Sequence, residues 1–200
     1  MKLAAIKSPD AKKLAHLSLH RAHLRFALEM LDLISQQKGE GTPLQVGLWR
    51  SAIFHYAKCF GRSNARNRLD AQEIFKGLPD AMVCHDHFKN LRNKNIAHDE
   101  NAYSQALPAA IINGPGEHNK IAKIVSLAFL AESLNPPDYQ NLYNLVRKAI
   151  EYVEQELDVV CTGITSELEK LSHAQLLKMD SVTYTLPGPN DVSKPRLTYY

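Results

Sequence analysis

The sequence predicts a mainly α-helical fold. Long segments repeat apolar residues at the three- and four-residue spacing of a helix face, and several begin with good capping residues. One stretch, at about residues 105–130, instead predicts an inserted β-hairpin. The length suffices for one domain, which we expect over residues 1–175, followed by an extended tail over residues 176–200.

Residues 11–36 predict a long helix with two apolar stripes. The second stripe consists of Leu19, Ala22, Phe26, Met30 and Leu33. Because a helix that is apolar on two sides is usually covered on both, we expect it inside a bundle or at a seam between two bundles. A polar strip with His16, His20 and His23 has a spacing that suits a metal ion, but no Cys or carboxylate accompanies it. We therefore expect no metal there, and a strip that faces solvent or a neighbouring helix.

The second helix is expected to begin at Thr42, which forms a capping-box pattern with Gln45, and to end at Gly61. A polar loop follows over residues 62–69, and a short helix is expected over residues 70–76. These signals are local, so they predict where the elements lie and not how they pack.

Pro79 begins a further helix, which we expect to end near His98. In the next segment, residues 102–134, Asn-Gly-Pro-Gly at 113–116 separates two apolar runs, as in a hairpin. A loop followed by a short helix also fits this segment. The residues after Pro136 repeat apolar side chains at helical spacing to about residue 172, whereas the proline-containing residues 180–200 show no periodicity.

The composition excludes several classes of protein. Hydrophobic residues make up 44% and charged residues 22% of the chain, which is typical of a globular protein and not of a disordered one. No run of about 18 apolar residues predicts a membrane span, and the first residues are too weakly apolar for a signal peptide. The three isolated cysteines predict neither disulfides nor a cysteine-rich zinc site, so we expect a cytoplasmic protein.

The positive charge is concentrated between Lys58 and Lys94. This segment has eight Lys or Arg residues against four Asp or Glu residues, so its net charge of +4 exceeds the +3 of the whole chain. A local surplus of this kind favours a polyanion such as RNA, although a solvated helix face has the same composition.

The most informative segment is Arg92-Asn93-Lys94-Asn95-Ile96-Ala97-His98. On an α-helix Arg92, Asn95 and His98 form a fan about 120° wide near the carboxyl end. A guanidinium binds phosphate through two hydrogen bonds and an imidazole moves protons near neutral pH, so the pattern predicts a phosphate site. The spacing of Arg92 and His98 is equally consistent with a surface arginine and a histidine that caps the helix.

This segment resembles the signature of the HEPN family, in which an arginine, a polar residue and a histidine stand with four to six residues between arginine and histidine; here there are five. The helix with Tyr56-Ala57 and Phe60 is similar to the second HEPN helix, and the resemblance covers roughly residues 11–172. It implies an up-and-down bundle of four or five helices, which forms a homodimer in which the two motifs face each other. Many members are metal-independent endoribonucleases, often toxins or defence effectors, with a nucleotidyltransferase-like antitoxin as partner.

Under this resemblance Arg92, Asn93 and His98 are the catalytic candidates. His98 would act as general acid or base on the ribose 2′-OH or the leaving oxygen, and Arg92 would stabilise charge on the phosphorus oxygens. Asn93 would orient Arg92, although the phase of an α-helix turns Asn93 away from the fan. Four further residues are expected to contact the substrate: His85, Lys89, Lys94 and Asn95. Cleavage would leave a 2′,3′-cyclic phosphate and use no cofactor.

Two other interpretations remain. Some HEPN proteins keep the fold without cleaving RNA, so the chain could be a dimeric interaction module that binds a partner protein or a nucleotide. It could also be a helical structural protein in which the spacing of Arg92 and His98 arose by chance.

Overall fold

The computed structural model describes residues 2–37, 41–98 and 100–195, and this part of the chain is mainly helical with one antiparallel pair of strands. The helices are α1 (Pro9–Gln36), α2 (Pro43–Phe60), α3 (Ala71–Ile74), α4 (Pro79–Leu91), α5 (Pro136–Leu168) and α6 (His173–Lys178). The strands are β1 (Ser104–Ile112) and β2 (Ile121–Leu130). The predictions of a mainly helical chain and of a hairpin are therefore confirmed, and the alternative of a loop and a short helix is wrong.

Capping residues begin the long helices as the sequence predicts. Ser8 caps α1, and Thr42 and Gln45 form the expected capping box at the start of α2, with hydrogen bonds of 3.2 and 3.3 Å. Asn135 caps α5 by accepting a hydrogen bond from the backbone N–H of Asp138 at 2.9 Å. These helix starts are thus determined by short-range hydrogen bonds that the sequence reveals directly.

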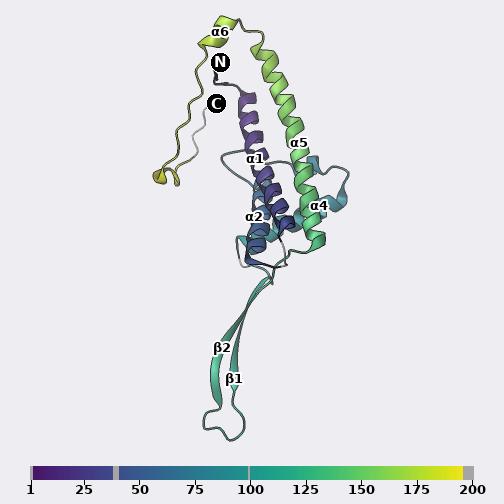
Figure 1. Cartoon of the computed structure of the whole chain (residues 1–200), viewed down its shortest axis with the longest axis vertical. Helices are drawn as coiled ribbons and strands as arrows, with labels where there is room; N and C mark the ends of the chain where they lie inside the picture. The colour runs from purple at the N-terminus through teal and green to yellow at the C-terminus, as the bar shows by residue number, and fades with distance from the viewer. Residues whose placement is uncertain (1, 38–40, 99, 196–200) are drawn as a thin grey trace.

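The core forms where α1 packs against α2 and α5, while α4 crosses the side of α2 and α5 (Figure 1). Fully buried side chains come from all four helices: Leu24, Leu31, Trp49, Tyr56, Phe88, Leu142, Val146 and Val153. The Trp49 and Phe88 rings meet edge to face at 5.8 Å between centroids, a favourable aromatic geometry. On the second stripe of α1, however, Phe26 and Leu33 each remain 39% exposed, so the single chain covers that stripe only in part.

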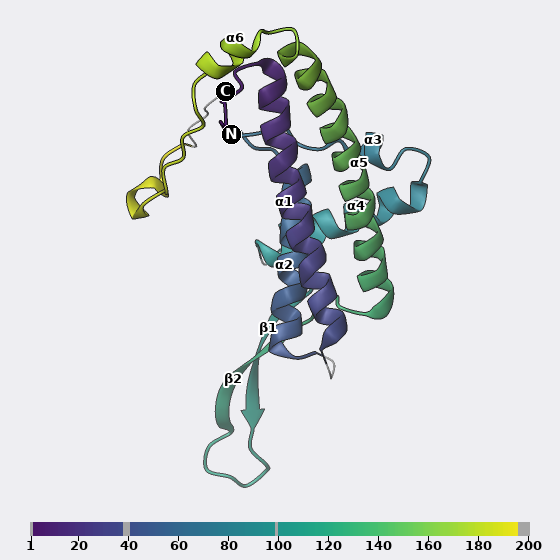
Figure 2. The same cartoon turned by 45° about the horizontal axis from the view of Figure 1, so that its top comes forward.

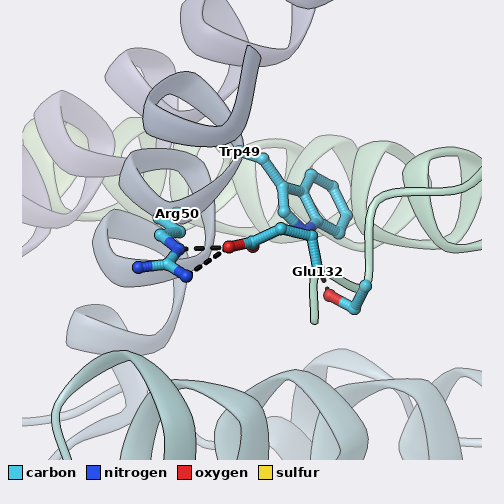
Figure 3. Close-up of polar contacts among 4 residues, drawn as sticks. Trp49, Arg50 and Glu132 are labelled. Atoms are coloured by element: carbon cyan, nitrogen blue, oxygen red, sulfur yellow. Dashed lines mark hydrogen bonds and ion pairs between the residues drawn. The ribbon is translucent and has the colours of Figure 1, made fainter. Parts of the chain in front are cut away.

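The hairpin leaves the bundle between α4 and α5, and Figure 2 shows it extending beyond the ends of α1 and α2. Its root is anchored to α2 by two contacts (Figure 3). The indole N–H of Trp49 donates to the hydroxyl of buried Ser133 at 3.0 Å, and Arg50 forms an ion pair with Glu132. The strands beyond the root are almost entirely exposed.

After α6 the chain returns to its own N-terminal segment. The backbone N–H of Ala5 donates to Asp180 at 2.7 Å, and that of Val182 donates to Leu3 at 2.9 Å. A 3₁₀ turn at Pro189–Asp191 follows, so an extended segment begins after α6 and not at residue 176. Residues 196–200 of the predicted tail lie outside the described residues. None of the helices in the described ranges is long and apolar enough to cross a membrane.

We expect Leu31→Ala to lower the free energy of unfolding by about 2–5 kcal/mol, because the substitution leaves a cavity in a fully buried position. The matched control is Leu33→Ala, two residues along the same helix and 39% exposed, for which we expect a much smaller loss. Equilibrium unfolding in urea measures both. Equal losses of unfolding free energy in the two variants would show that Leu31 does not lie on the buried face of α1 as described.

Candidate functional site

The signature segment does not continue α4 as an α-helix. Residues Arg92–Ile96 form a π-helix, in which the backbone N–H of Ala97 donates to the carbonyl of Arg92, five residues back, at 2.9 Å. The helical structure ends at Ile96, so His98 lies beyond it and is exposed. The fan that an α-helix would form through Arg92, Asn95 and His98 is therefore not the geometry of this segment. Asp99, which follows, lies outside the described residues.

Asn93 contacts Arg92 directly, although on an α-helix it would point away from the fan of Arg92, Asn95 and His98. Its side-chain oxygen accepts a hydrogen bond from a terminal nitrogen of the Arg92 guanidinium at 2.9 Å. Asn93 thus restricts the guanidinium of Arg92.

Arg92 is further placed by Phe54 on α2. The guanidinium carbon lies 5.4 Å from the centre of the Phe54 ring, and the ammonium of Lys58 lies 5.9 Å from the same ring. The Nε of Arg92 is buried and has no hydrogen-bond partner among the described residues. Sequence reasoning missed Phe54; the signal available was its position four residues before Lys58 on one helix face.

An open cavity of about 600 Å³ lies beside Arg92, between the end of α2, the loop that follows α2, and α4. Six basic side chains line it: Lys58, Arg62, Arg66, Arg68, Lys89 and Arg92. Asn93 and Phe60 also line it, and the described lining includes no carboxylate. The local charge surplus seen in the sequence is thus gathered around one cavity, where it creates a positive field that favours an anion.

Of the other predicted residues, Lys89 lies at the cavity and three lie outside its described lining. Lys94 and His98 are exposed and Asn95 is partly buried, and none of the three is among the described residues that line the cavity. Lys89 lines the cavity, as expected of a residue that contacts substrate. Arg62, Arg66 and Arg68 come from the loop that the sequence marks only as polar.

His85 is a core residue, so its prediction as a substrate contact is wrong. It is 3% exposed, and its Nδ1 forms a 2.8 Å hydrogen bond with the hydroxyl of buried Tyr56. The Phe60 and Phe75 rings also contact the imidazole. Burial lowers the pKa of His85, which keeps it neutral at pH 7. On an α-helix His85 lies on the same face as Arg92, as predicted. At His85, however, this face of α4 packs into the core.

The histidine strip of α1 holds the basic loop in place. His16 Nδ1 accepts a hydrogen bond from the backbone N–H of Asn67 at 3.2 Å, and His20 Nε2 lies 2.8 Å from the Asn67 carbonyl oxygen. His23 instead pairs with His55 of α2, with 3.0 Å between their Nδ1 atoms. The strip thus faces the loop and α2, and the described residues contain no group of three or more His, Cys, Asp or Glu side chains that could hold a metal ion.

Burial keeps His20 and His23 uncharged near neutral pH. It lowers the pKa of His20 to about 4, assisted by the nearby charge of Arg66, and the pKa of His23 is also lowered to about 4. His20 donates from Nε2 to the Asn67 carbonyl, whereas His16 accepts at Nδ1 from the Asn67 N–H. The two histidines therefore anchor the loop with one donor and one acceptor.

Acid should destabilise the fold, because it places a charge on a buried histidine. The unfolded chain binds a proton on His20 below pH 6.5, whereas the folded chain does not until about pH 4. Stability is therefore fully present above pH 6.5 and declines as the pH falls, by about 2 kcal/mol at pH 5 from this residue alone. His20→Gln, which keeps a donor for Asn67, should reduce that decline in urea unfolding, while His173→Gln on exposed α6 should leave it unchanged. A decline that is identical in all three proteins would contradict the assignment.

No family model, curated protein or solved structure matches this chain. The cavity and the residues around it are therefore the basis for inferring the function.

Proposed function

We propose that this protein is a HEPN-like ribonuclease, which binds the phosphate backbone of RNA in the basic cavity and cleaves it without a metal ion. The observation that carries the proposal is the cavity itself, where six cationic side chains converge and the described lining contains no carboxylate. Neighbouring phosphates along a single strand would neutralise several of these cations at once, whereas a small monoanion would neutralise fewer of them.

Arg92 is the best-placed residue to bind the phosphate that reacts. Asn93 and Phe54 restrict its guanidinium, so little side-chain freedom is lost when an anion binds. Its hydrogen-bond donors would stabilise the charge that builds on the nonbridging oxygens of phosphorus in the transition state.

The reaction that this arrangement supports is a transesterification. The ribose 2′-oxygen attacks phosphorus, the bond to the 5′-oxygen breaks, and the products are a 2′,3′-cyclic phosphate and a 5′-hydroxyl end. One base must remove the proton of the 2′-OH and one acid must protonate the 5′-oxygen. His98 is exposed and outside the cavity lining, so the proposal requires a homodimer in which the His98 of a second copy reaches the cavity.

The position of His98 also favours a second candidate function, in which the protein binds RNA or another phosphate-rich partner without cutting it. In that case the cavity acts alone and His98 has no chemical role. A nucleotidyltransferase-like antitoxin as partner, and a role as a toxin or defence effector, stay predictions from the resemblance.

Removing cavity cations should weaken RNA binding and reduce its salt dependence. We expect Arg62→Ala/Arg68→Ala to lower the slope of log affinity against log salt by about one for each phosphate that the variant no longer binds. Fluorescence anisotropy with a labelled single-stranded RNA measures this in a His98→Ala background, which keeps the RNA intact. The control Arg147→Ala/Lys178→Ala removes two exposed cations outside the cavity and should leave the slope nearly unchanged. Equal effects of the two pairs would mean that binding is not localised to the cavity.

Cleavage should depend on His98 and Arg92 and not on metal. In EDTA, the unmodified protein should cut RNA to 2′,3′-cyclic ends, and His98→Ala should lower the rate by about 10²–10⁴-fold while RNA binding and melting temperature persist. Arg92→Lys keeps the charge but cannot bind phosphate through two parallel hydrogen bonds, so its rate should also fall. Denaturing gels and end-group analysis measure both. Full activity in His98→Ala would overturn the role of His98, and tight binding with no cleavage at any protein concentration would favour the second candidate.

A further inference from the structure

A second cavity, of about 330 Å³, lies where the loop between α2 and α3 meets α1 and α5. Ligand cavities in proteins range from about 300 to 1,000 Å³, so this one suits a single ring system. Its interior is partly apolar, because Leu17 and Leu69 line it and are each 6% exposed. Charged side chains that are exposed to solvent also line it: Lys13, Arg68, Asp70 and Glu73. A flat ring with apolar faces and polar edges fits a lining of this kind.

One buried acceptor of this lining has no donor. His20 lines the second cavity and is 2% exposed. Since its Nε2 donates to the Asn67 carbonyl, Nδ1 carries no proton in the neutral imidazole and can only accept. Nδ1 is buried and has no hydrogen-bond partner among the described residues. A buried polar atom without a partner costs free energy, so a ligand that brings an N–H group to His20 is favoured.

The charged groups of the second cavity also favour a ligand that donates hydrogen bonds. The described lining has three carboxylates against two cations: Asp70, Glu73 and Glu156 against Lys13 and Arg68. Glu156 pairs with Lys13 at 2.7 Å, and the Asp70 side chain caps the start of α3. Burial and a hydrogen bond to Glu73 raise the pKa of Tyr152, so the Tyr152 hydroxyl stays protonated and donates to Glu73. Because a carboxylate has about four lone-pair sites, Glu73 can accept further hydrogen bonds from a ligand.

The second cavity shares a wall with the basic cavity. Arg68 lines both of them, and the backbone of its neighbour Asn67 is held by His16 and His20. The loop therefore lies between a place for phosphates and a place for a flat ring. Proteins that read single-stranded RNA commonly hold the backbone at basic groups and take unstacked bases into adjoining pockets.

We propose that the second cavity binds an unpaired guanine of the RNA strand, and that Glu73 selects it. This inference rests on the proposed function, because the guanine belongs to the strand that the basic cavity holds. Guanine carries its N1–H and its 2-amino group side by side, and one carboxylate accepts hydrogen bonds from both. The remaining N–H of the 2-amino group is then free to donate to Nδ1 of His20.

The other three bases do not match Glu73 in this way. Uracil offers one N–H between two carbonyl oxygens, which a carboxylate repels. Adenine and cytosine each offer an amino group beside a ring nitrogen that accepts, so they give a carboxylate one hydrogen bond where guanine gives two. The preference for guanine thus follows from the donors on its edge.

Binding of guanosine and inosine tests the proposal, since inosine lacks only the 2-amino group. Two short oligouridylates carry one or the other at the same central position, and fluorescence anisotropy measures their affinities for the His98→Ala protein, which leaves the RNA intact. We expect the RNA with guanosine to bind roughly 10- to 150-fold more tightly, as for one hydrogen bond to a charged group.

Glu73→Gln should bring this ratio close to one, because an amide has one acceptor oxygen and turns a donor toward the donors of the base. The matched control Glu29→Gln makes the same change on the exposed face of α1, outside the lining of the second cavity, and should keep the ratio. Glu73 is exposed, so both variants should keep the melting temperature of the parent protein.

Equal affinities of the His98→Ala protein for the two RNAs, or a ratio that Glu73→Gln leaves unchanged, would overturn the guanine site while RNA binding by the basic cavity still held. Failure of the His98→Ala protein to bind either RNA would instead overturn the proposed function, and the guanine site with it. The comparison of the two RNAs needs no variant of the second cavity, so it decides the question even if Glu73→Gln does not fold.

Discussion

Two hydrogen bonds to the backbone of Asn67 hold the loop between α2 and α3 against α1. They come from His16 and His20, which are almost fully buried, and burial keeps the pKa of His20 far below neutrality. The loop carries three of the six cations of the cavity, so its position decides where half of the positive charge lies. Together with the hydrogen bonds of Leu69 to Cys59 and of Arg66 to Lys58, they hold the loop against the mutual repulsion of its arginines.

The cavity therefore keeps like charges together at a cost in stability. Surface cations usually separate or pair with carboxylates, yet Lys58, Lys89 and Arg92 face the same cavity and form no ion pair with carboxylates in the described ranges. A polyanion would offset that cost on binding. Within the π-helix, Asn93 holds the Arg92 guanidinium by a hydrogen bond. Binding sites often lower the stability of the folded protein in this way.

The sequence predicted best what local interactions determine. The capping box at Thr42, the start of the helix at Pro79 and the turn between the two strands all depend on neighbouring residues, and all were found. The site was predicted in part: the local charge surplus and a contact between Asn93 and Arg92 were expected, but the π-helix was not, because the pattern gave no sign of it. His85 was assigned wrongly because its burial is decided by Tyr56, Phe60 and Phe75, which approach from other elements. Helix phase alone does not say which face of a helix a neighbour covers.

The central claim, that the cavity binds phosphate groups, is tested most directly by thermal unfolding in the presence of tripolyphosphate at constant ionic strength. A ligand that binds the folded chain alone raises its melting temperature. The account predicts a rise that saturates with tripolyphosphate in the unmodified protein and that is largely abolished in Arg92→Gln, with chloride at the same ionic strength giving no such rise. A melting temperature that does not respond to tripolyphosphate, or that responds equally in both proteins, would contradict it.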